Sequence, residues 1–193
     1  MIELEVNGNT RTIEPATIDE LRGAIAAVPE GHTLFRVFVD GREVGVEQIR
    51  DLDLAAVRRV EVSSAPASEI ARGAVGETTE WIDRICGVLR SVSADYRLGR
   101  DREANEKLVH VIDALQVLAH LLCGIQGNID METERRKRFD EDWTSALGEL
   151  QQAVEAVVKD FERQDSIELA DRSGYDLPRA LETFRGLLGQ IDA

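Results

Sequence analysis

The stretch Ser63-Ser64-Ala65-Pro66-Ala67-Ser68 decides how this chain folds, because the spacing of the apolar residues changes there. Before it, apolar and polar residues alternate in short runs separated by tight turns, a period typical of strands with one buried face. After it, apolar residues recur every three or four positions, as in amphipathic helices. We therefore expect two domains, residues 1–64 and 67–193, joined by a linker over residues 64–68.

The first domain contains several short strand-like runs and one helix. Strands are expected at residues 2–6, 10–14, 33–39, 42–44 and 57–62, with tight turns at Asn7-Gly8 and Asp40-Gly41. Thr17 and Glu20 form a capping box, so a helix begins behind Thr17. This order of elements resembles the β-grasp, or ubiquitin-like, fold, and the resemblance is one of topology over residues 1–64.

The second domain is predicted to be an antiparallel α-helical bundle, which makes the protein α+β. Helices are expected at residues 69–97, 103–126, 131–163 and 166–172, with a break at Ser173-Gly174 and a last helix at residues 178–191. The third of these carries a heptad-like seam, which is typical of bundle packing. The seam consists of Trp143, Leu147, Leu150, Val154, Val157 and Phe161.

Composition restricts the partners and the location. The formal net charge of −14 repels phosphate groups, so we expect neither nucleic acid nor a membrane as partner. The N-terminus carries no signal-peptide pattern, and no run reaches the about 18 apolar residues of a membrane span. We therefore predict a cytoplasmic protein.

Sequence signatures of enzymes and cofactors are absent. The chain has no Gly-rich phosphate loop, no Gly-x-Ser-x-Gly elbow and no Cys-x-x-Cys pair. Cys86 and Cys123 lie in apolar helical patterns, so both are expected to be buried free thiols, although the sequence does not determine whether they are neighbours. We predict a protein that is not an enzyme and that has no metal site and no cofactor.

One histidine supports an alternative function. The run His120-Leu121-Leu122-Cys123-Gly124 is similar to the His-x-Leu-Lys-Gly run of histidine phosphotransfer domains, which also fold as helical bundles. That resemblance implies a phosphoryl relay through His120. Cys123 stands where the family has its lysine, and a neutral thiol does not offset the charge of an incoming phosphoryl group.

The leading prediction is a non-enzymatic interaction or adaptor protein. Residues 165–181 and the run from Tyr96 to Asn105 resemble, in the order of elements over residues 69–191, poorly characterised bacterial proteins and flagellar export chaperones. The resemblance implies a chaperone associated with motility or secretion, which binds a protein partner. Aromatic residues are scarce here and interfaces favour them, so four aromatic residues and one leucine are the candidate contacts, if they are exposed. These are Trp81, Tyr96, Trp143, Tyr175 and Leu177. A third prediction is a structural homo-oligomer that pairs through the seam of residues 143–161.

Overall fold

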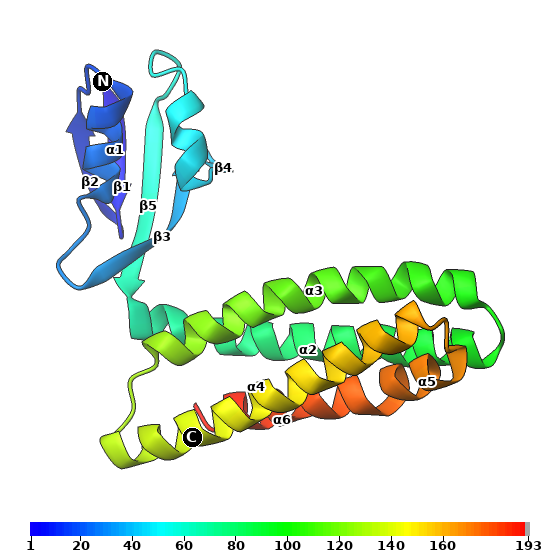
Figure 1. Cartoon of the computed structure of the whole chain (residues 1–193). Coiled ribbons are helices and arrows are strands. Elements are labelled where there is room, and N and C mark those ends of the chain that lie inside the picture. The colour runs from blue at the N-terminus through cyan, green and yellow to red at the C-terminus, as the bar shows by residue number, and fades with distance from the viewer. Residues whose placement is uncertain (192–193) are drawn as a thin grey trace. The chain divides into compact units, whose positions relative to one another are not determined.

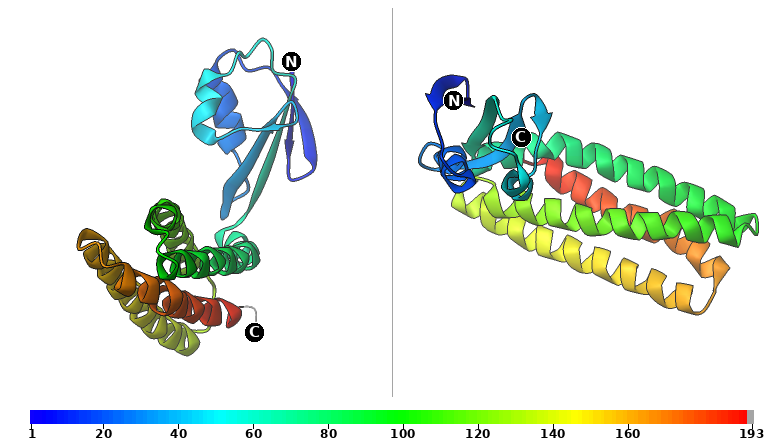
Figure 2. Two further views of the ribbon diagram at one scale, coloured as in Figure 1. Left: turned by 90° about the vertical axis from the view of Figure 1, so that its right-hand side faces the viewer. Right: turned by 90° about the horizontal axis from the view of Figure 1, so that it is seen from above.

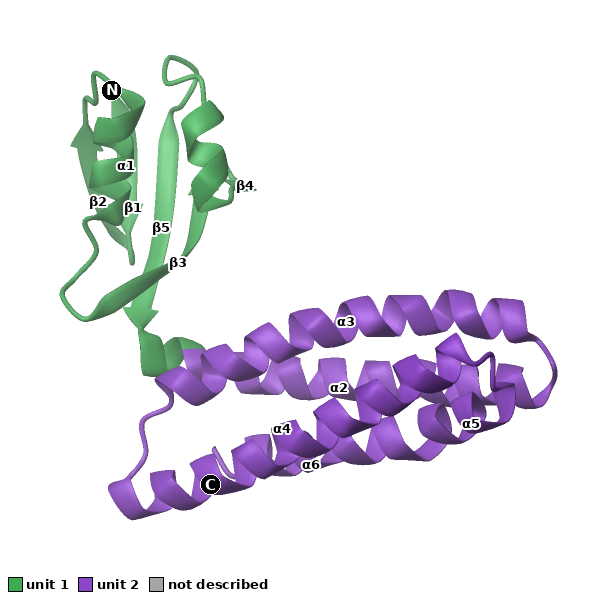
Figure 3. Ribbon diagram, viewed as in Figure 1, with its two compact units in different colours: residues 1–70 green, residues 71–193 purple. Residues whose placement is uncertain are grey.

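The structure is a computed structural model that describes residues 1–191. It divides into two compact units, residues 1–70 and residues 71–193 (Figure 3). The first unit holds a five-stranded mixed sheet and the second is helical, which confirms the predicted α+β class (Figure 1).

The first unit contains five strands, one α-helix and one 3₁₀ helix. They are β1 (Ile2–Val6), β2 (Asn9–Ile13), α1 (Ile18–Ala26), β3 (His32–Val39), β4 (Arg42–Glu43), η1 (Val46–Asp51) and β5 (Arg59–Pro66). The order of strands in the sheet is β2-β1-β5-β3-β4. The central pair, β1 and β5, is parallel, and the other three pairs are antiparallel.

Local sequence explains the turns and the helix start of this unit. Asn7 and Gly8 have φ angles of 49° and 82°, and Asp40 and Gly41 have 49° and 81°. Two successive residues with positive φ make the turn that matches the twist of a hairpin, so both predicted turns are confirmed. The Glu20 amide donates to Thr17 Oγ1 at 3.2 Å, as the predicted cap requires.

Alternation along the strands puts apolar side chains on one face of the sheet, where they pack with α1 and η1. This core consists of Ile2, Leu4, Leu21, Ile25, Val37, Val39, Ile49, Val57, Val60 and Val62.

The predicted linker over residues 64–68 is wrong. β5 continues to Pro66, because Ser64, Ala65 and Pro66 pair with the first residues of β3. The side chain of Asn7 also holds Ser64 in place, since its Nδ2 donates to the Ser64 carbonyl at 2.9 Å and its Oδ1 accepts from the Ser64 amide at 2.8 Å. The next helix begins directly at Ala67.

The second unit is built from long helices joined by short turns. They are α2 (Ala67–Arg97), α3 (Asp101–Asn128), α4 (Thr133–Glu162), α5 (Ser166–Asp171), the π-helical turn η2 (Arg172–Asp176) and α6 (Leu177–Gly189). The chain reverses direction after α2, α3 and α4 (Figures 1 and 2). The predicted break at Ser173-Gly174 is wrong, because η2 continues the helical path from α5 into α6.

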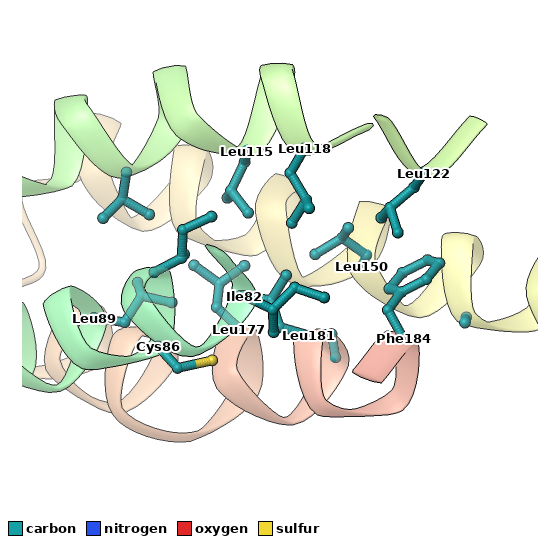
Figure 4. Packing of buried hydrophobic residues seen from close by; sticks show 14 of the residues in the cluster. Ile82, Cys86, Leu89, Leu115, Leu118, Leu122, Leu150, Leu177, Leu181 and Phe184 are labelled. Atoms are coloured by element: carbon teal, nitrogen blue, oxygen red, sulfur yellow. The ribbon is translucent and has the colours of Figure 1, made fainter. Parts of the chain in front are cut away.

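Apolar side chains from the long helices meet in one core. Figure 4 shows Leu89 of α2, Leu118 of α3, Leu150 of α4 and Phe184 of α6 pointing toward one another. Trp143 lies between Phe139 and Phe184, with ring centroids 5.2 Å from each. The buried residues of the predicted seam therefore pack against other residues of the same chain.

α3 is long and apolar enough to cross a membrane by its length and composition. The prediction that no part of the chain is long and apolar enough for a membrane span is therefore wrong by length and composition. One face of α3 packs into the core of the helical unit, through residues that include Leu115, Leu118 and Leu122 (Figure 4). Core helices of soluble proteins meet the same criterion, so α3 by itself gives weak support for a membrane span.

Candidate partner-binding groove

A groove of about 450 Å³ lies between the C-terminal half of α2 and the π-helical turn η2. Its lining comes from two segments that are far apart in the sequence. The lining residues are Arg90, Ser93, Ala94, Arg97, Leu98, Gly174 and Tyr175.

Gly174 lets the backbone of η2 approach α2 closely. A β-carbon built on Gly174 would lie 2.7 Å from Ser93 Oγ and 3.3 Å from Ser93 Cβ. Both distances are shorter than ordinary contacts of about 3.5–4.0 Å between carbon atoms. Only glycine therefore fits here without displacement of a neighbour, and the wall of the groove is bare backbone at this point.

Tyr175 stands at the edge of the groove and is held there by Arg97. The Tyr175 side chain is 62% exposed, and the guanidinium carbon of Arg97 lies 5.6 Å from its ring centroid. Arg97 also donates to Asp171 Oδ1 at 3.0 Å. The contact with Tyr175, and then that with Asp171, raises the pKa of Arg97, so this guanidinium stays charged. The ring of Tyr175 is thus exposed and lies against a guanidinium that is itself paired with Asp171.

Arg90 contributes a second positive charge, and it makes no ion pair with any residue in the range 1–191. Arg97, by contrast, lies beside the carboxylate of Asp171. The groove therefore carries one unpaired guanidinium together with the apolar atoms of Ala94 and Leu98.

Arg172 anchors η2 to α4. Its Nε donates to Asp160 Oδ2 at 3.3 Å, and its terminal nitrogens lie 2.6 Å from Asp176 and 3.3 Å from Glu168. The hydrogen bond to Asp176, followed by that to Asp160, raises the pKa of Arg172. Asp160 is only 6% exposed, so Arg172 offsets a buried carboxylate and fixes the turn that presents Tyr175.

The five predicted contact residues have different environments. Tyr175 is exposed at the groove, and Trp81 is half-buried against the core. Tyr96, Trp143 and Leu177 are buried, so they do not meet the condition of exposure on which the prediction depended. The hydroxyl of Tyr96 donates to Asn105 Oδ1 at 2.5 Å, which satisfies the polar end of a buried side chain.

Of the seven lining residues, only Tyr175 was predicted as a contact from the sequence. Arg90 and Arg97 are seven positions apart and so lie on one face of α2, a spacing that could have indicated them. Gly174 was interpreted as a helix breaker, and no local signal shows that it packs against another helix.

The residues of the alternative relay lie on the outer side of α3. His120 is exposed, and its Nδ1 lies 2.7 Å from the Gln116 carbonyl, to which it donates, so in the neutral ring the lone pair lies on Nε2. Cys123 is exposed, which corrects the prediction that both thiols are buried, whereas Cys86 is buried as expected. Residues 108–128 contain no lysine or arginine that could stabilise a phosphoryl group.

Among residues 1–191, the acidic side chains do not converge on a metal site. Within residues 1–191, no group of three or more histidine, cysteine, aspartate or glutamate side chains is arranged to hold a metal ion.

Comparison with known proteins places the helical unit in a family. No curated protein and no solved structure matches the chain. A family model described as "Domain of unknown function (DUF8042)" matches residues 74–186, which is more than half of the chain. The match includes both segments that line the groove. The chain therefore belongs to the DUF8042 family.

Proposed function

We propose that the chain is a non-enzymatic protein-interaction protein whose helical unit holds a segment of a partner protein in the groove between α2 and η2. The observation that carries this proposal is Tyr175, an exposed aromatic ring in contact with Arg97, which is itself paired with Asp171. Because the contact with Arg97 already restrains the ring, binding would lose less side-chain entropy. Aromatic anchors of this kind contribute strongly to protein interfaces.

The chemistry of the lining supports binding rather than catalysis. The seven lining residues include no histidine, cysteine or carboxylate. The hydroxyls of Ser93 and Tyr175 therefore have no general base among the lining residues to activate them. The apolar atoms of Ala94 and Leu98, next to two guanidinium groups, suit contact with a peptide.

We also propose finer assignments for the two units. The strand order β2-β1-β5-β3-β4, with a parallel central pair and one helix between β2 and β3, supports a β-grasp, ubiquitin-like first unit. The reversals after α2, α3 and α4 support an antiparallel bundle (Figure 1). In this proposal the bundle binds the partner and the β-grasp unit recruits or positions the complex, as an adaptor in the cytoplasm. A chaperone role in motility or secretion is one version of it.

Site-specific photo-cross-linking tests the proposal. A photoreactive phenylalanine derivative replaces Tyr175 in the full chain, expressed in the native cells. A matched chain carries the same group at Ile167, which is 77% exposed on α5 and does not line the groove. We expect a discrete cross-linked protein from position 175 and none of that mass from position 167.

Loss of the Arg97 contact provides a control for the cross-link at position 175. Arg97→Gln in the position-175 chain should weaken the product, because the ring loses the group that orients it. Equal labelling from positions 167 and 175, or no discrete product from position 175, would exclude the groove as the binding site.

The exposure of His120 keeps one alternative function open, a phosphoryl relay through its Nε2. Incubation with acetyl phosphate, or with a phosphorylated receiver domain, would label the wild-type chain and spare His120→Gln. Absence of phosphohistidine in the wild-type chain would end this alternative.

A further inference from the structure

We infer that the groove between α2 and η2 takes an acidic peptide segment, with one carboxylate at Arg90 and one large apolar side chain between Leu98 and Tyr175. The inference rests on the proposed function and names the chemistry of the partner.

The charge of Arg90 indicates a carboxylate as the first group of the peptide that binds here. Arg97 is already paired with Asp171 at 3.0 Å, whereas Arg90 has no ion-pair partner in residues 1–191. In a chain of net charge −14, the unpaired guanidinium of Arg90 gives the groove a positive site for an anion. The planar fork of a guanidinium matches a single carboxylate with two parallel hydrogen bonds. One unpaired arginine therefore calls for one carboxylate rather than for the more highly charged phosphate group.

The exposed apolar surfaces of Leu98 and Tyr175 indicate a large apolar side chain as the second group of the peptide. Leu98, the first residue after α2, is 65% exposed, and the exposed ring of Tyr175 faces the same groove. Ala94 adds a small, exposed methyl group beside them in the lining of the groove. A leucine or phenylalanine placed there would be covered by Leu98, Ala94 and Tyr175.

The separation of the two subsites sets the spacing within the ligand. Arg90 and Leu98 are eight residues apart, which is about 12 Å along a helix at 1.5 Å per residue. An extended peptide covers about 3.3 Å per residue. The ligand is therefore expected to place its apolar residue three or four positions from its aspartate or glutamate.

Selection from a random peptide library displayed on phage, with the immobilised full-length chain as target, tests this inference. We expect enrichment of peptides with an acid and a large apolar residue three or four positions apart. Fluorescence polarisation of the best labelled peptide then gives its affinity for variants. Arg90→Gln should weaken binding about fivefold, the value for an exposed ion pair of about 1 kcal/mol. The affinity should also fall as sodium chloride is raised from about 50 to about 300 mM.

Two variants serve as controls. Arg84→Gln removes the same charge from an exposed position of α2 outside the groove and should leave the affinity unchanged. Arg90→Glu should lose the acidic peptide and recover binding when the acid of the peptide is replaced by lysine.

The possible failures are distinguishable. Enriched peptides that lack an acid but lose affinity with Tyr175→Ala would overturn the ligand chemistry and leave the proposed groove intact. Peptides that bind Arg90→Gln and Tyr175→Ala as well as wild type, or a selection without enrichment, would overturn both the ligand chemistry and the groove as a peptide site.

Discussion

Replacement of Gly174 by alanine should destabilise the helical unit, although alanine is the better helix former. In an ordinary helix interior, glycine to alanine stabilises by up to about 1 kcal/mol. At this position the new methyl group would lie 2.7 Å from Ser93 Oγ and 3.3 Å from Ser93 Cβ. The hydroxyl can rotate away, but the contact between the two β-carbons stays too short unless α2 and η2 move apart.

The two opposing contributions give the expected magnitude. Insertion of a methyl group into a well-packed site costs typically about 1–3 kcal/mol. After subtraction of the gain in helix propensity, a loss of about 1 kcal/mol remains, with a range from near zero to about 2 kcal/mol. For a chain of this length a loss of about 1 kcal/mol lowers the melting temperature by about 2–4 °C.

Gly186 is the matched control. It lies in α6 and is exposed, and a methyl group added to its α-carbon would meet no atom of another residue within 4 Å. Gly186→Ala should therefore stabilise the chain by up to about 1 kcal/mol. The same substitution should thus change the free energy of unfolding in opposite directions at Gly174 and at Gly186.

The measurement is urea unfolding followed by tryptophan fluorescence. The chain has two tryptophans, Trp81 and Trp143, and both lie in the helical unit, so the signal reports on that unit. Ser93→Ala should relieve part of the effect of Gly174→Ala and Ser93→Gly should relieve more, with a coupling free energy of about 1 kcal/mol between the two sites. A stabilising Gly174→Ala, or an effect unchanged by the substitutions at Ser93, would refute the close approach of η2 to α2.

Four further results are expected. Arg172→Met should destabilise the helical unit by about 2–3 kcal/mol, because it leaves the carboxylate of Asp160 buried without its cation. Arg163→Met, at the exposed end of α4, should be near neutral, and equal effects of the two substitutions in urea unfolding would contradict this role of Arg172. Burial, and then the charge of Asp101, raises the pKa of Tyr96 from 10.0 to about 12, so the folded state holds this proton more tightly. The associated stability is complete below pH 10 and is lost as pH rises from about 10 to about 12, by at most about 3 kcal/mol. Absorbance titration of Tyr175→Phe, whose remaining tyrosine is Tyr96, should show a midpoint near 12, and a midpoint near 10 would show that Tyr96 is not buried. Cys123 should react at once with a thiol reagent and Cys86 only on unfolding, because Cys86 is buried and burial raises its pKa; rapid reaction of two thiols in the native chain would argue against this packing. Light scattering should give a mass near 21.4 kDa at all concentrations, since Trp143, Leu150 and Val157 of the heptad-like seam pack within the chain, and a mass that doubles would restore the homo-oligomer.

Helices, strands and tight turns could be predicted from sequence wherever their cause is local. The alternation from Ile2 to Val6 and the turn at Asn7-Gly8 depend on neighbours within a few residues. The extent of β5 could not be predicted, because Ser63 to Pro66 have no marked strand pattern. Their extension of β5 comes from pairing with β3, which starts about thirty residues earlier in the chain.

The candidate site depends far more on tertiary structure. From composition, Trp143 and Tyr175 are equally good candidates for contact, but Trp143 lies between Phe139 and Phe184 while Tyr175 is directed outward from a π-helical turn. That turn exists because Arg172 reaches Asp160 on α4 and Gly174 fits against Ser93 on α2, although the local sequence at Ser173-Gly174 favours a break. Amino-acid order by itself determined which segments are helix or strand and where most of them reverse. Which aromatic rings face solvent, and which arginines lack a carboxylate, was decided only when distant segments packed together, because burial and ion pairing are properties of neighbours in space.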